Sequence, residues 1–201
     1  MTMSGTLPRH KDDRLTISQD EINSLPLKAF EGKVHVITEP QKISSLFKEI
    51  EKHEVVGFDT ETRPSFKKGQ VYKVALIQIA LDHKAYLIRT HHTGVTDELA
   101  SIFESHKIIK AGVAIHDDIK ALQKFRKFDP ASFVDLSTVA RKAGYQVESV
   151  KKLAALLLGF RISKSAQTSN WEAPTLTEKQ LEYAATDAWV CLEIYKRLHN
   201  F

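Results

Sequence analysis

The pattern of apolar and polar positions predicts an α/β fold built around a mixed sheet. Three apolar stretches, "EVVGFDTE", "YKVALIQIAL" and "HKAYLIR", follow one another between residues 54 and 89. The second is almost continuously apolar, which is typical of a central strand with both faces covered. Almost no loop separates it from the third, and so short a connection requires antiparallel pairing. We therefore expect three antiparallel strands in this part of the chain.

Beyond residue 90 the periodicity alternates between helix and strand. It predicts helices at about 95–105, 114–127, 136–143 and 149–158, with the strands "KIIKAG" and "SFVDL" between the first three. Strands that are joined through helices pair in parallel. Ahead of the three antiparallel strands we expect a short helix in "TISQDEINSLPLKAF", an edge strand in "KVHVIT" and a helix in "PQKISSLFKEIEKH". The predicted fold is a mixed sheet, three antiparallel strands and then parallel ones, flanked by helices.

Length and composition favour one domain. Residues 1–16 are polar and without pattern, which predicts a flexible tail, and residues 17–201 are expected to form a single domain around a core drawn from 42% hydrophobic residues. The single cysteine, Cys191, excludes an internal disulfide framework and a cysteine-based zinc cluster, as in a reducing cytoplasm. No apolar run reaches the roughly 18 residues of a membrane span. These features predict a cytoplasmic protein with no membrane partner.

One acidic residue interrupts the apolar side of the C-terminal helix expected over residues 177–198. On a helical wheel Asp187 lies among apolar side chains, one turn after Tyr183, whereas Glu182, Thr186 and Trp189 lie on the narrow remaining arc. An unpaired carboxylate in an apolar environment would cost several kcal/mol or stay protonated. We therefore expect a compensating group beside Asp187.

Two further segments place acids where apolar side chains would be expected. In "VVGFDTE" the alternation of a strand puts Asp59 and Glu61 on one face, unless the strand runs into solvent there. In "AGVAIHDDIKALQKF" a helical wheel places Asp118 within the buried stripe and Asp117 at its margin. The alternative for Asp118 is an ordinary acid at a helix cap or in a first turn, where it favours the helix dipole.

Four inward-facing acids from three separated segments suggest a shared counter-charge. Two divalent cations would balance them, and ligands with oxygen atoms alone suit Mg²⁺ or Mn²⁺. Two such ions, roughly 3.5 to 4 Å apart, form a known clamp for in-line displacement at phosphorus. The pattern therefore predicts a phosphodiesterase.

The same residues carry a resemblance to a known family. The motifs "FDTE", "GVAIHDDIKAL" and "YAATDA" occur in the order found in the DEDD superfamily of 3′-5′ exonucleases, which share a ribonuclease H-like fold. The resemblance covers about residues 33–198, and "KVALIQIA", "NW" and "LTEKQLEYAATDA" are most similar to the Werner-type and ribonuclease D exonuclease domains. Tyr183, four positions before Asp187, resembles the tyrosine (DEDDy) subgroup, since the histidine subgroup would have a histidine at Glu182.

The resemblance implies a role for each motif residue. Asp59, Glu61 and Asp187 would hold the ion that activates water, Asp59 would bridge to the second ion, and Asp118 would support that second ion. Tyr183 would orient the attacking water, because an ordinary phenol with a pKa near 10 is a poor base. The alternative for Tyr183 is a half-buried tyrosine of the core.

The resemblance also implies where nucleic acid binds. In the loop "RISKSAQTSNWE", Lys164 and Gln167 would meet the scissile phosphate or the terminal nucleotide. Trp171 would stack a base or, alternatively, fill the core beneath the loop. Phe66, just after the first motif, would act as a wedge. The expected substrates are DNA or RNA 3′ ends, single-stranded or frayed.

Two departures from the family pattern limit this comparison. Werner-type domains have an aromatic residue where this chain has Lys120, which puts that part of the groove in doubt. Ribonuclease D continues into helical domains, whereas this chain ends at Phe201, so we expect a stand-alone nuclease core or one whose substrate affinity comes from a partner protein. Two other functions remain as alternatives: a catalytically inert nucleic-acid-binding module with the same fold, and a phosphohydrolase acting on a small molecule.

Overall fold

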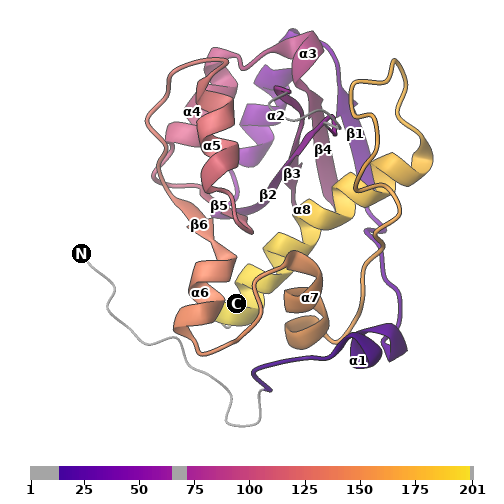
Figure 1. Ribbon diagram of the computed structural model, residues 1–201. Coiled ribbons are helices and arrows are strands. Elements are labelled where there is room, and N and C mark those ends of the chain that lie inside the picture. The colour runs from indigo at the N-terminus through magenta and orange to yellow at the C-terminus, as the bar shows by residue number, and fades with distance from the viewer. Residues whose placement is uncertain (1–13, 65–71, 200–201) are drawn as a thin grey trace.

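The computed structural model describes residues 14–64 and 72–199, and its strands form one mixed sheet (Figure 1). The order across the sheet is β1-β4-β3-β2-β5-β6. Strand β3 pairs antiparallel with β2 and β4, while β1 is parallel to β4, and β5 is parallel to β2 and β6. The strands are β1 (Lys33–Ile37), β2 (Val55–Thr62), β3 (Val74–Ala80), β4 (Lys84–Arg89), β5 (Ile109–Gly112) and β6 (Phe133–Asp135). This confirms the predicted sheet.

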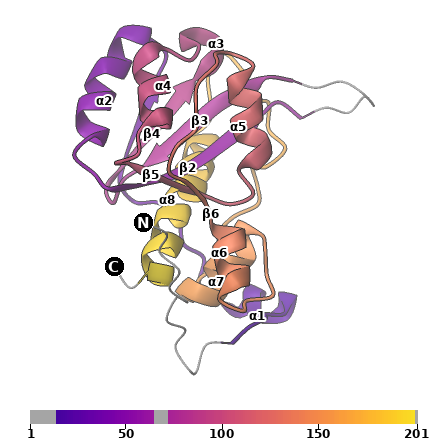
Figure 2. The same cartoon turned by 90° about the vertical axis from the view of Figure 1, so that its left-hand side faces the viewer.

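Helices cover both faces of the sheet (Figure 2). Those on one face are α2 (Ile43–Ile50), α4 (Asp97–Glu104) and α5 (His116–Gln123), together with the short α3 (Thr90–Thr93) beside β3 and β4. The other face is covered by the long α8 (Glu178–His199), against which α6 (Leu136–Lys142) and α7 (Val150–Leu158) pack. The sequence pattern missed α3, because four residues are too few to show helical periodicity.

The strand residues divide between the two faces as alternation predicts. Val56 and Phe58 of β2 belong to the core beneath α2 and α4, whereas Val55 packs against the core under α6, α7 and α8. Every residue of β3 is buried, as expected for a central strand. Helix α8 crosses β2, β3, β4 and β5 and so closes the second face.

The N-terminal region packs more closely than the sequence suggested. Helix α1 (Gln19–Ser24) begins at a capping box in which Ser18 and Glu21 satisfy each other's backbone N–H groups. Of the tail expected over residues 1–16, residues 1–13 lie outside the described residues. The Leu15 carbonyl accepts a hydrogen bond from the Gln146 N–H at 2.8 Å, and its side chain packs against the core. The segment around Leu15 therefore belongs to the packed fold.

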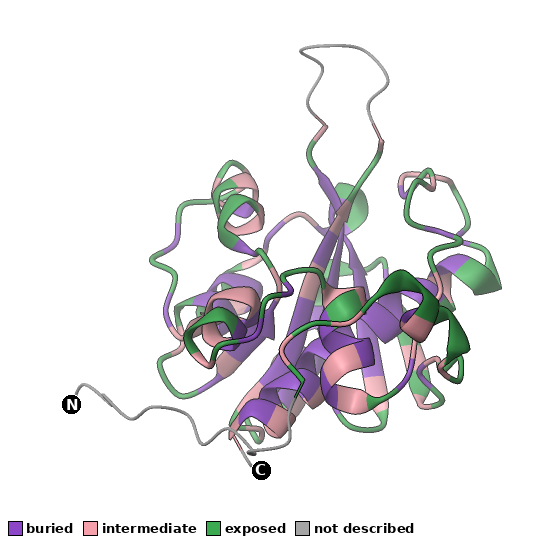
Figure 3. Ribbon diagram, turned by 60° about the horizontal axis from the view of Figure 1, so that its bottom comes forward, coloured by how far each residue is buried: buried purple, intermediate pink, exposed green. Residues whose placement is uncertain are grey.

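Burial along α8 extends around almost the whole helix (Figure 3). Thr186 lies on the narrow arc outside the apolar sides of the helical wheel, yet it is only 4% exposed. Its hydroxyl donates to the Glu182 carbonyl at 2.6 Å and accepts from the Phe30 N–H at 3.0 Å. The segment that leads into β1 covers this side of α8. No helix within the described ranges is long and apolar enough to cross a membrane.

Candidate active site

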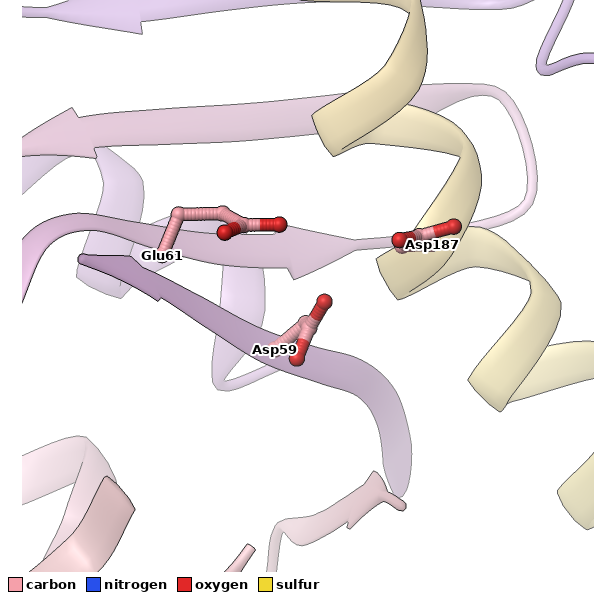
Figure 4. A group of neighbouring side chains, drawn as sticks. All are labelled: Asp59, Glu61 and Asp187. Atoms are coloured by element: carbon pink, nitrogen blue, oxygen red, sulfur yellow. The ribbon is translucent and has the colours of Figure 1, made fainter. Parts of the chain in front are cut away.

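Three of the four predicted carboxylates converge at one point (Figure 4). Asp59 and Glu61 project from β2, and Asp187 faces them from α8. One oxygen of each lies within 4.8 Å of the other two. The strand alternation and the helical wheel thus placed these side chains correctly, and α8 brings the two segments together.

The local backbone explains why this approach is possible. The side chains of α8 around Asp187 that face the sheet are alanines with no exposed surface, so the helix packs close to the strands. The pairing of β2 with β3 is irregular between Glu61 and Thr62, and a bulge of this kind re-aims a neighbouring side chain. Small residues and an irregular strand end therefore make room for the acidic cluster.

Burial and mutual repulsion raise the pKa of each carboxyl. The pKa of Asp59 lies well above its usual value because of burial first and then the charges of Asp187 and Glu61. Burial, followed by the Asp187 charge, raises the pKa of Glu61 to about 8. Burial also raises the pKa of Asp187 to about 6. Like charges this close cannot all remain ionised unless a cation neutralises them.

Asp118 reaches the cluster from the other face of the sheet. Its Oδ1 accepts a hydrogen bond from the Thr60 hydroxyl at 2.6 Å, and its charge contributes to the raised pKa of Asp59 and Glu61. It is not within the 4.8 Å group, and it lies in the first turn of α5, so the first-turn interpretation also holds. The neighbouring Asp117 side chain is 94% exposed. This confirms the prediction that Asp118 faces inward and that Asp117 lies at the margin of the helix.

Tyr183 lies one helical turn before Asp187 and interacts with it. A hydrogen bond between the two side chains lowers the pKa of Asp187, while burial raises the pKa of Tyr183 above its usual value. The phenol therefore stays protonated and acts as a donor. The Lys151 ammonium group of α7 lies 5.7 Å from the centre of the Tyr183 ring, and its charge lowers the pKa of Glu61 and Asp187.

The carboxylates open into a pocket of about 800 Å³. Its walls come from β2, α8, the first turn of α7, the loop after α7 and helix α1. Lys164 and Gln167, the predicted substrate contacts, are exposed on that loop and line the pocket. The Lys151 ammonium group donates a hydrogen bond to Gln167 Oε1 at 3.3 Å. Positive and polar groups thus face the acidic cluster across the pocket.

A sequence profile of the 3′-5′ exonuclease family matches residues 34–201. The chain belongs to this exonuclease family. It is 36% identical over 190 residues to the bifunctional 3′-5′ exonuclease/ATP-dependent helicase WRN of Mus musculus, an alignment that covers 89% of this chain and 13% of that protein. The chain thus spans only a small part of this relative. The resemblance predicted from the motifs is confirmed.

Two solved structures of exonucleases share the fold. The EXO domain of Aedes aegypti Nibbler is 27% identical, with a TM-score of 0.75, and the match covers 86% of this chain and 91% of that one. Escherichia coli RNase D is 24% identical, with a TM-score of 0.76, over 83% of this chain and 44% of that one, and shows likeness of fold. The ribonuclease H-like fold expected from the resemblance is therefore confirmed.

Trp171, one of the predicted substrate contacts of this exonuclease-family chain, does not line the pocket. Trp171 has no exposed surface and packs against Tyr183, with ring centroids 6.0 Å apart. This corrects the expectation that it stacks a base, and supports the alternative that it fills the core. Phe66 lies outside the described residues. Lys120, the departure from the Werner-type pattern, is exposed and pairs with Asp117 at 3.7 Å.

Sequence reasoning missed two residues at the site. Lys151 could not be told from Lys152 beside it, because both line the pocket and only the packing of α7 places the Lys151 ammonium group over the Tyr183 ring. Gln78 carried a signal, since it is the one polar residue within the apolar run of β3. It pairs with Asp59 in the register of β2 and β3, has no exposed surface, and its amide finds no partner among the described residues.

Proposed function

We propose that this chain is a two-metal-ion 3′-5′ exonuclease that releases nucleoside 5′-monophosphates from single-stranded or frayed 3′ ends of DNA or RNA. The observation that carries the proposal is the convergence of Asp59, Glu61 and Asp187 within 4.8 Å. Membership of the 3′-5′ exonuclease family supports it.

The donor set of the site suits magnesium or manganese. The converging atoms are all carboxylate oxygens, which hard divalent cations prefer. Asp187 Oδ1 is buried and has no hydrogen-bond partner among the described residues, so it remains available to a cation. Asp59, Glu61 and Asp187 would hold one ion, and Asp59 with Asp118 would hold a second. Bound there, the cations would supply a nucleophilic water and neutralise charge on the phosphate.

The other side chains of the site have assignable roles. Tyr183 remains protonated, so we assign it the orientation of the attacking water through its hydroxyl. The Thr60 hydroxyl fixes the rotamer of Asp118 by donating to it at 2.6 Å. Lys151 and Lys164 line the same pocket and are placed to contact phosphates of the entering strand.

The shape of the pocket favours a single strand. Its wall combines the acidic cluster with lysines and polar groups of α7 and of the loop after it. The lysines would contact the phosphates of a single strand whose 3′ end lies at the cations. An unpaired 3′ end can be threaded to the carboxylates, whereas a closed duplex would first have to fray. We therefore expect blunt duplexes to be degraded more slowly than single strands.

A time course on a 5′-labelled single strand with Mg²⁺ or Mn²⁺ tests the proposal. We expect a descending ladder of products, nucleoside 5′-monophosphates in the released fraction, and no cleavage in EDTA. Matched DNA and RNA strands in the same assay measure the sugar preference. Label that stays intact at all metal concentrations supports the inert binding module, and hydrolysis of nucleotides but not of oligomers supports a small-molecule phosphohydrolase.

Variants with matched controls separate chemistry from folding. Asp59→Ala and Asp187→Ala should abolish cleavage while the fold persists, and Tyr183→Phe should leave a small residual rate. Asp118→Ala should lose most activity, whereas Asp117→Ala should retain it because that side chain faces solvent. Full activity in Asp59→Ala would exclude the proposed mechanism.

A further inference from the structure

The indole of Trp171 combines complete burial with an N–H that lacks a full hydrogen bond. The side chain has no exposed surface, and no acceptor among the described residues lies in hydrogen-bonding geometry to Nε1. A buried donor without an acceptor costs roughly 1–3 kcal/mol, so such groups are rare in the absence of a function. The position of this N–H therefore calls for an explanation.

The indole lies beside the acidic cluster. It packs in one core cluster with Leu76, which is the cross-strand partner of Glu61 in the register of β2 and β3, so it lies on the Glu61 side of the sheet. From there the indole N–H acts on the Glu61 carboxyl as a donor and lowers its pKa. Its ring packs against the ring of Tyr183, whose hydroxyl interacts with Asp187. Trp171 therefore lies in the core beside Glu61 and Tyr183 and does not line the pocket.

The segment that carries Trp171 is tied to the sheet and to α8. The buried guanidinium group of Arg89, at the end of β4, donates to the carbonyls of Ala173 and Pro174, the latter at 2.8 Å. On the other side, Gln180 Nε2 of α8 donates to the Asn170 carbonyl at 3.3 Å. Anchors on both sides of Trp171 hold the indole at a fixed place relative to β2.

We propose that Trp171 is a positioning residue, whose indole N–H donates to one oxygen of Glu61 and holds the other oxygen toward the cation site. This inference rests on the proposed function, because it concerns the carboxylate that would bind the ion. An indole N–H is a donor only, and it therefore favours the ionised, metal-binding form of its acceptor. Partners that orient metal ligands in this way typically contribute 10- to 100-fold to metal affinity.

The chain offers a matched control for this inference. It has two tryptophans, and the second, Trp189, stacks on Phe160 at 5.8 Å and contacts Phe30, on the other side of α8. In a ¹⁵N–¹H spectrum of the metal-free protein, the two indole N–H signals are assigned by Trp171→Phe and Trp189→Phe. At pH 9, above the pKa of about 8 of Glu61, we expect Glu61→Gln to move the Trp171 signal upfield, because a neutral amide is a weaker acceptor than a carboxylate, and to leave Trp189 in place.

Metal titration provides the second measurement. Direct Mn²⁺ binding to the Trp171→Phe protein should be weakened by roughly 10-fold or more, with a matching rise in the Mg²⁺ concentration for half-maximal cleavage, whereas Trp189→Phe should change neither. Circular dichroism and the melting temperature show whether each variant is folded. If Trp171→Phe does not fold, the Glu61→Gln spectrum alone tests whether the Trp171 indole donates to Glu61.

The possible outcomes separate the two proposals. If wild-type protein binds Mn²⁺ and cleaves nucleic acid, but Trp171→Phe binds the ion equally well and Glu61→Gln leaves both indole signals unchanged, the positioning role is wrong and the nuclease function stands. If wild-type protein binds no divalent cation, both proposals are overturned.

Discussion

Gly57 of β2 lies directly against Ala188 of α8, and this contact sets how closely the helix approaches the sheet. A β-carbon at position 57 would stand 1.9 Å from the Ala188 carbonyl oxygen and 3.1 Å from the Leu192 backbone nitrogen. Both opposing atoms are backbone, so no side-chain rotation can relieve the clash. Asp59 is two residues after Gly57 and Asp187 is the residue before Ala188, so the same contact brings these carboxylates together.

Gly57→Ala should therefore separate the two halves of the site. The added methyl must push α8 away from β2, which widens the gap between Asp187 and the acids of β2. We expect a loss of Mn²⁺ affinity and of cleavage by at least 10-fold, together with a lower melting temperature, measured by titration calorimetry and the ladder assay. Gly159→Asn is the control: Gly159 has φ +73° with open space around it, a conformation that asparagine tolerates. Unchanged metal binding in Gly57→Ala would contradict this account of the helix position.

Removing one carboxylate should stabilise the metal-free protein. Burial and the neighbouring acids raise the pKa of Asp59 well above its usual value, which means that its charged form is disfavoured in the folded chain. We expect Asp59→Asn to raise the melting temperature in EDTA and to abolish the further rise that Mg²⁺ gives the wild type through binding to the folded state. Asp117→Asn, at an exposed acid, should behave like the wild type in both conditions. A lower melting temperature for Asp59→Asn in EDTA would show that the cluster is not under electrostatic strain.

Because Lys110 of β5 is buried, we expect the free energy of unfolding to rise with pH in the alkaline range. The side chain has no exposed surface, its ammonium group donates to the carbonyls of Ser105 and Ile108 at 2.8 and 2.7 Å, and burial lowers its pKa to about 8. Between about pH 8 and the ordinary lysine value near 10.4, the unfolded chain holds a proton that the folded chain releases, so rising pH favours the folded state. The two carbonyl contacts favour the ammonium form, so we expect a gain on the order of 1–2 kcal/mol.

Chemical denaturation of the wild type and of Lys110→Met at several pH values measures this effect. The free energy of unfolding of the wild type should rise relative to that of the variant as the pH increases through this range. Lys107→Met changes an exposed lysine nearby and should show no such difference. Parallel curves for the wild type and Lys110→Met would contradict the lowered pKa.

Pocket lysines should affect substrate binding more than the chemical step. Lys151 and Lys164 line the pocket that contains the carboxylates, and each is assigned a phosphate contact. We expect Lys151→Ala and Lys164→Ala to raise KM with a smaller change in kcat, and to reduce the slope of log KM against log salt by roughly 0.7 for each lost contact to a single strand. Lys179→Ala, at an exposed position of α8, is the control. A salt slope equal to that of the wild type would remove the phosphate contact from the proposal.

By itself, the sequence determined the order of the strands and of every helix named above except the short α3, and the face on which each acid lies. Alternation along β2 placed Asp59 and Glu61 on one face, and the helical wheel of α8 placed Asp187 inward, because these periodicities depend on backbone geometry alone. The motif order then identified the family, and with it the ribonuclease H-like fold.

Only the tertiary structure decided which groups meet and which are buried. Helical periodicity placed Thr186 outside the apolar sides of α8, and the sequence of the loop left Trp171 with two possible roles. Neither pattern carries information about the segments that pack over these residues. Lys151 became part of the site through the position of α7, and Asp118 joined it through Thr60 from the opposite face of the sheet. The physical reason is that local periodicity fixes the direction of a side chain relative to its own element. The distance between carboxylates that are more than a hundred residues apart depends on how closely α8 packs on β2.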